Sequence, residues 1–157
     1  LSKQIFVVAG EPYNRSSDFF EENIRNYEYD CIVDLALEAL EYNNIALINA
    51  PFTREIRDMG YIDKLKEKLK EKSATLVVIW VETSPEIVRQ RMITRNSDRD
   101  TWKLENWDEY IGSCNFDIPQ NLDDSNIKDD LLIFKNNNDE EFEGSMKDIL
   151  EILEKTI

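Results

Sequence analysis

Apolar residues along the chain follow two patterns. Continuous runs without alternation occupy residues 5–8, 45–48, 76–81 and 131–134. Runs of this length are typical of strands that are covered on both faces, so we expect buried, parallel strands. Between these runs apolar residues recur with helical spacing, which predicts helices over roughly 17–41, 62–72, 84–95, 101–111 and 142–155.

This alternation of strands and helices predicts an α/β fold, with a three-layer parallel sheet flanked by helices. The firmest boundary is Ser84-Pro85-Glu86, where a capping serine, a proline at the first helical position and an acid in the first turn begin a helix. The stretch 115–128 has no period and is expected to be a surface connection. We expect residues 1–157 to form a single domain.

Composition excludes several classes of function. The 157 residues carry a net charge of −14 and no histidine. The negative field disfavours binding to nucleic-acid backbones, and without histidine a zinc hydrolase is not expected. Proton transfer is left to Asp, Glu, Lys and Tyr. Two cysteines without C-x-x-C spacing, no long apolar run and no signal peptide predict a cytoplasmic protein that does not cross a membrane.

A basic stretch, residues 86–103, stands out in this acidic chain. Arg91 and Arg95 are four residues apart and share a helix face, and Arg99 and Lys103 follow. Two interpretations are open. The arginines could hold a triphosphate, because guanidinium groups pair bidentately with phosphate oxygens. Alternatively, they pair with Asp98, Asp100 and Glu86 on a solvated face.

Residues 77–107, which include Ser-Pro-Glu, Arg-x-Arg-Met, Arg and Arg-Asp, resemble the fourth strand, helix and lid of P-loop kinases. Residues 45–54 resemble the third strand of a bacterial group of predicted small-molecule kinases. The resemblance implies a P-loop NTPase fold of the nucleotide-kinase type, with a lid around 91–103. It implies that Arg95 and Arg99 act on the transferring phosphoryl group of ATP, with Mg²⁺, and that Arg91 supports them.

Other positions follow from this resemblance or from the expected sheet. Gly10 corresponds to the first glycine of the phosphate loop, and Asn136 and Asn137 lie where such kinases cradle adenine, although an Asn run is as easily a plain turn. Phe52, Thr53 and Arg54 are expected at the carboxyl end of the sheet, where open α/β folds bind ligands, and are our candidates for contacts to the acceptor. Trp107 and Tyr110 have helical spacing, which favours packing over a pocket.

The chain departs from the family at the phosphate loop. After Gly10, Arg15 and Ser16 stand where the second glycine and the lysine of G-x-x-x-x-G-K-[ST] belong. Three explanations are open: the intact protein carries a further segment between Gly10 and Glu11, the chain is a trimmed fragment, as a start at Leu1 also suggests, or it is a degenerate relative. Asn49 stands where the group more usually has Asp, which leaves the metal ligands and the base unassigned.

These expectations define the functional hypotheses. The first is an ATP-binding, kinase-like phosphotransferase that acts on a small-molecule acceptor. The second is a non-catalytic nucleotide-binding or interaction domain that has kept the fold. A nucleotide hydrolase is a weaker third hypothesis, because it shares the fold and needs no acceptor.

Overall fold

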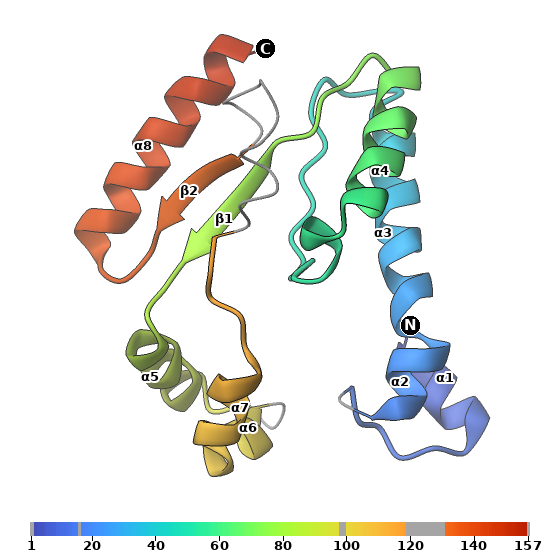
Figure 1. Ribbon diagram of the computed structural model, residues 1–157, viewed down its shortest axis with the longest axis vertical. Coiled ribbons are helices and arrows are strands. Elements are labelled where there is room, and N and C mark those ends of the chain that lie inside the picture. The colour runs from blue at the N-terminus through green and yellow to red at the C-terminus, as the bar shows by residue number, and fades with distance from the viewer. Residues whose placement is uncertain (1, 16, 98–99, 119–130, 157) are drawn as a thin grey trace. The chain divides into compact units, whose positions relative to one another are not determined.

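The computed structural model describes residues 2–15, 17–97, 100–118 and 131–156 (Figure 1). The chain divides into two compact units, and each is described by itself. The first comprises residues 1–51 and 68–74, and the second comprises residues 52–67 and 75–157. In the part of the chain that the structure covers, no helix is both long and apolar enough to cross a membrane.

Helices dominate both units. The first unit contains α1 (Ser2–Ala9), α2 (Asp18–Asn23), α3 (Arg25–Ala39) and the end of α4 (Met59–Glu71). The second unit contains the 3₁₀ helix η1 (Glu55–Arg57), the start of α4, β1 (Val78–Glu82), α5 (Pro85–Arg95), α6 (Thr101–Glu105), α7 (Trp107–Ser113), β2 (Leu131–Lys135) and α8 (Asp139–Thr156).

The first apolar run forms a helix, so the prediction of a strand at 5–8 is wrong. Helix α1 buries Phe6, which is 1% exposed, against Phe20 and Ile24, whereas Val7 and Val8 face solvent. A four-residue apolar run does not distinguish a strand from a buried helix segment. The packing of Phe6 on one helical face decides the outcome here.

The second apolar run, 45–48, forms neither a strand nor a helix. Ile45 and Leu47 are 51% and 83% exposed, so the expected burial on both faces is also not found. The helix predicted over 17–41 is present as α2 and α3, which meet at Ile24. The break gives Ile24 a φ of −127° and buries its side chain in the Phe6 cluster.

The other two apolar runs form the strands that the sequence predicts. Strands β1 and β2 pair in parallel, with Val78 opposite Leu131 and Glu82 opposite Lys135. Because parallel strands need a crossover connection, α5, α6 and α7 lie between them in the sequence. Among the described residues the sheet has these two strands.

Apolar clusters cover both faces of this sheet. On one face Ile56 and Ile62 pack with Trp80 and its neighbours in the sheet. On the other face Ile149 of α8 packs with Leu132 and Phe134, and Figure 1 shows α8 running alongside β2. The strands are covered only in part, since Leu132 and Phe134 of β2 are buried while Val81 of β1 is 55% exposed, so the full burial that their continuous apolar runs predict is not found.

Helix α5 begins and ends as its sequence predicts. The hydroxyl of Ser84 accepts a hydrogen bond from the amide of Ile87, Pro85 occupies the first turn, and Asn96 ends the helix in the left-handed conformation. The single helix expected over 101–111 is instead α6 and α7. Asn106 separates them, because its amide side chain donates to the carbonyl of Trp102 at 2.9 Å.

The expected three-layer parallel sheet stays a prediction, since two of its four expected strands are present in the described residues. What the structure does provide is one parallel strand pair joined by a helical crossover. The carboxyl ends of this pair position the candidate site.

Candidate functional site

The loops that follow β1 and β2 lie side by side at the carboxyl end of the sheet. The amide of Asn136 donates to the carbonyl of Glu82 at 2.9 Å, which extends the strand pairing by one residue beyond β2. The hydroxyl of Thr83 lies 3.5 Å from the carbonyl of Asn136. In open α/β sheets the carboxyl ends of the strands are where ligands bind.

Asn137 fixes the geometry of this edge. Its side-chain oxygen accepts a hydrogen bond from the amide of Ser84 at 2.7 Å, and its side-chain nitrogen donates to Glu141 at 2.8 Å. The main-chain amide of Asn137 donates to the same carboxylate oxygen at 3.0 Å. The side chain predicted to contact a nucleotide is thus used within the protein, where it joins the start of α5 to the start of α8.

Arg91 and Asn136, both predicted to bind nucleotide, are brought together. The Nη2 group of Arg91 donates to the side-chain oxygen of Asn136 at 3.2 Å, and the contact is exposed to solvent. These residues are 45 positions apart in the sequence, so only the parallel register of β1 and β2 places them in contact.

Arg95, predicted to be catalytic, forms an ion pair with a buried acid. Its Nε and Nη2 groups both donate to Oδ2 of Asp100, at 2.9 and 2.6 Å. The side chain of Asp100 is 1% exposed, and that of Arg95 is 47% exposed. Arg95 thus pairs with one of the acids named in the alternative interpretation, but this acid is buried and not on a solvated face. Arg99, the other predicted catalytic residue, lies outside the described residues.

Two further cations of the basic stretch rest on aromatic rings. The guanidinium of Arg89 lies 5.4 Å from the centroid of Trp107, and the ammonium of Lys103 lies 5.0 Å from that of Tyr110. The two rings themselves are 5.7 Å apart. Both rings therefore contact neighbouring side chains, with cations among the partners, and the preference for packing over a pocket stays a prediction.

Tyr110 is held in its protonated form. Burial raises its pKa to about 12, and the charge and hydrogen bond of Cys114 and the charge of Asp100 act in the same direction, while Arg95 opposes them. At neutral pH the group is a phenol, so it can donate a hydrogen bond but is a poor general base. The spacing of aromatic residues gave no signal of this environment.

Gly10 ends α1 and does not follow a strand. It has a φ of +72°, and its amide donates to the carbonyl of Val7 while the amide of Glu11 donates to that of Phe6. These two bonds form a Schellman motif, which uses a residue in the left-handed conformation to end a helix. Both amides therefore serve the helix end in this structure. A further segment at this point stays a prediction.

The predicted acceptor residues lie at the start of the second unit. Phe52 packs against the buried pair Ile56 and Ile62 and has a positive φ of 44°, which is uncommon for a bulky residue. Thr53 is exposed, and Arg54 precedes the first turn of η1. Their contact with an acceptor stays a prediction.

Two residues at this edge, Asn138 and Glu141, form hydrogen bonds that the sequence did not predict. Glu141 anchors Asn137, and its own amide donates to the side chain of Asn138 at 2.9 Å. An Asn followed three residues later by a Glu is close to a capping-box pattern, and this pattern could have placed the start of α8. Within the described ranges, no group of three or more His, Cys, Asp or Glu residues is arranged to hold a metal ion.

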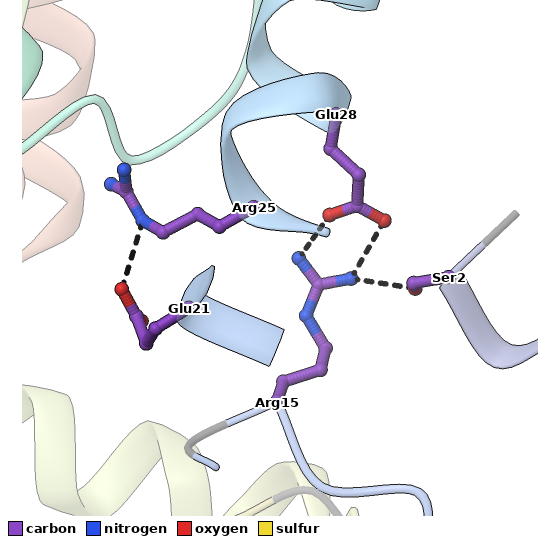
Figure 2. A network of polar contacts seen from close by, with 5 residues as sticks. All are labelled: Ser2, Arg15, Glu21, Arg25 and Glu28. Carbon is purple, nitrogen blue, oxygen red and sulfur yellow. Dashed lines mark hydrogen bonds and ion pairs between the residues drawn. The ribbon is translucent and has the colours of Figure 1, made fainter. Parts of the chain in front are cut away.

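The first unit contains a separate polar network and a cavity. Figure 2 shows Arg15 donating to both carboxylate oxygens of Glu28, at 3.4 and 2.9 Å, and to the hydroxyl of Ser2. A cavity of about 370 Å³ lies beside this ion pair. Its lining consists of Arg15, Glu28, Tyr29, Cys31, Ile32, Asn49, Ala50 and Pro51. Because Glu28 neutralises Arg15, this cavity carries no unbalanced cation for a phosphate.

We compared the chain with protein-family models, with curated proteins and with solved structures, and none of these comparisons gives a match.

Proposed function

We propose that this protein is a kinase-like ATP-binding protein that binds the nucleotide phosphates beside the carboxyl ends of β1 and β2 and transfers the γ-phosphoryl group to a small-molecule acceptor. The observation that carries the proposal is the contact between Arg91 and Asn136. It joins the helix that follows β1 to the loop that follows β2, at the edge where open α/β sheets bind ligands.

The charges near this edge suit an anionic ligand. Arg91 and Arg95 lie one turn apart at the end of α5, and both are exposed in a protein whose net charge is −14. Arg95 is paired with Asp100, so the unbalanced positive charge of this pair of arginines is that of Arg91, whose printed partner is the neutral Asn136. This charge can attract phosphate oxygens although the distant field is negative, because interactions beyond about 8 Å are screened at physiological ionic strength. Phosphoryl transfer depends mainly on such positioning and charge stabilisation.

Magnesium would accompany the nucleotide. Mg²⁺ in such sites is held by one or two carboxylates together with the substrate phosphates, so it does not need a cluster of three protein ligands. Glu82 is an acidic residue at the carboxyl end of β1, and Asn137 is bonded to Glu141 instead. Glu82 is the residue that we would test first as a metal ligand.

Titration calorimetry with MgATP tests the binding step. We expect Arg91→Ala and Arg95→Ala each to weaken binding about tenfold, which is the effect of losing one charge-assisted hydrogen bond. Arg89→Ala is the matched control, since it removes the same charge from the same helix at a residue that stacks on Trp107. Equal affinities for the wild type and both test variants would exclude this site.

A second candidate, the non-catalytic nucleotide-binding or interaction domain, is favoured by a different observation. All four basic side chains described above already have partners within the chain: Arg89, Arg91, Arg95 and Lys103. If these contacts only stabilise α5 to α7 and the protein is an interaction domain, MgATP will not raise the melting temperature, because a ligand stabilises only the state that binds it. A non-catalytic nucleotide-binding domain would show the rise in melting temperature without turnover.

Turnover separates the remaining hypotheses. A kinase releases ADP in proportion to phosphorylated acceptor, whereas a hydrolase releases ADP without one. The intact mass of protein purified from its source tests for a further segment at Gly10 and Glu11. A mass several kDa above 18.5 kDa, together with peptides that map between Gly10 and Glu11, would support the kinase, and a mass of 18.5 kDa would favour the non-catalytic domain.

A further inference from the structure

The side chain of Asp100 does not cap the helix that follows it. Asp100 occupies the N-cap position of α6, where an aspartate commonly accepts hydrogen bonds from the first amides of its helix. Here its side chain makes no such capping bond. Instead Oδ2 accepts two hydrogen bonds from Arg95, the last residue of α5.

Within the described residues, Asp100 uses one edge of the Arg95 guanidinium. Asp100 takes the side edge, formed by Nε and Nη2, with a single oxygen atom. The end-on edge, formed by Nη1 and Nη2, can also pair bidentately with a phosphate, and the Arg95 side chain is 47% exposed. An ion pair with a buried carboxylate restricts the rotamers that a long arginine side chain would otherwise sample.

We propose that Asp100 is a positioning residue, which holds Arg95 with the end-on edge of its guanidinium towards solvent as a receptor for a phosphate group. This inference rests on the proposed function, and it names a part of the site that the basic residues alone do not reveal. Orientation, and not net charge, is the contribution of Asp100, because the ion pair as a whole is neutral.

Neighbouring groups keep the pair in place. Asp100 donates its amide to the carbonyl of Ser97 at 2.8 Å, and Asn96 reverses the chain directly after Arg95. Tyr110 of α7 lies close enough to sense both charges, and its raised pKa has Asp100 among its causes. Three short helices therefore meet around a single carboxylate.

The sign of the effect of Asp100 on affinity distinguishes positioning from electrostatics. Removing a carboxylate makes the surroundings of the ligand more positive, so electrostatics alone would tighten the binding of an anion. If Asp100 positions Arg95, its removal weakens binding despite the gain in positive charge. A purely structural role would lower stability without a specific loss of affinity.

The experiment measures MgADP affinity by calorimetry for the wild type, Asp100→Ala and Asp100→Asn. We expect both variants to bind about fivefold more weakly, as coupled neighbouring residues do when one is removed. Asp100→Asn keeps the shape and an acceptor oxygen, so it remains informative if the alanine variant fails to fold. Glu105→Gln is the matched control, because it removes one negative charge from an exposed position of α6; we expect its affinity to stay within about twofold of the wild type.

A double-mutant cycle excludes a merely structural explanation. In an Arg95→Ala background the Asp100 substitutions are expected to change the affinity no further, since the side chain that they position is gone. Equal losses in both backgrounds, or tighter binding in the Asp100 variants, would overturn the inference alone. A wild-type protein that binds neither MgADP nor MgATP would overturn the proposed function and the inference together.

Discussion

Replacing Asn137 by alanine is expected to destabilise the second unit through the loss of two side-chain hydrogen bonds. One joins Asn137 to the amide of Ser84 at 2.7 Å, and the other joins it to the carboxylate of Glu141 at 2.8 Å. Neutral hydrogen bonds contribute about 1 kcal/mol and those to charged groups somewhat more, but both contacts are only partly buried. We therefore expect a loss of about 2 kcal/mol in the free energy of unfolding.

Tryptophan fluorescence during urea unfolding is the suitable assay. The three tryptophans, Trp80, Trp102 and Trp107, all belong to the second unit, so the signal reports the unit that contains Asn137. With a urea dependence of about 2 kcal/mol per molar, the midpoint should fall by about 1 M. Asn137→Asp should lower it further at neutral pH, because the donor is lost and a second carboxylate is placed beside Glu141.

The matched control is Asn43→Ala. Asn43 lies in the first unit and makes one exposed hydrogen bond, from its side chain to the carbonyl of Ala39 at 2.9 Å. Its replacement should leave the fluorescence midpoint unchanged. If Asn137→Ala shifts that midpoint no more than Asn43→Ala does, the hydrogen bonds of Asn137 do not hold the carboxyl edge together and the reasoning fails.

Three further variants test other parts of the structure. Phe6→Ala should destabilise the first unit by about 3 kcal/mol in hydrogen exchange, whereas Val8→Ala, at an 87% exposed position, should change it by less than about 0.5 kcal/mol. Arg57→Ala should lower the free energy of unfolding by about 2 kcal/mol, because the guanidinium of Arg57 lies 5.2 Å from the centroid of the Trp80 ring and donates to two main-chain carbonyls. The fluorescence midpoint in urea should fall accordingly, and an unchanged midpoint would argue against both contacts. Absorbance at alkaline pH should show a tyrosine phase near pH 12, and Tyr110→Phe should remove that phase. Because the folded pKa of Tyr110 is raised, its contribution to stability is complete below its unfolded pKa of about 10 and is lost as the pH rises towards 12.

Local signals in the sequence identified the elements whose ends carry their own chemistry. Ser84 and Pro85 predict the start of α5 because the hydroxyl cap and the fixed φ of proline act on neighbouring residues alone. The same holds for the strands in residues 76–81 and 131–134, whose apolar runs are long enough to require cover on both faces.

Where the prediction failed, the deciding contacts come from elsewhere in the chain. Residues 5–8 are as apolar as a strand, but the ring of Phe6 packs against those of Phe19 and Phe20, which favours a helix. Gly10 was compatible with either structure, since a glycine can follow a strand or close a helix.

The site was predicted in part. The sequence singled out Arg91, Arg95 and Asn136, but the contact between Arg91 and Asn136 depends on the register of two strands 53 residues apart, which no local pattern encodes. The sequence also named Asp100 as a partner of the arginines, but it did not predict that this acid is buried, because an acid that follows several arginines resembles any other surface charge.

Residues of the two units alternate along the sequence, which limits where the protein can be cut into fragments that fold. The path changes unit between residues 51 and 52, again between 67 and 68, and a third time between 74 and 75. A fragment that starts at residue 75 would retain both strands and α8 but would lack Ile56 and Ile62, which cover Trp80. Exposed apolar area of that kind promotes aggregation, so such a fragment should express poorly, and a gene fusion or truncation should keep residues 52–67 with the sheet.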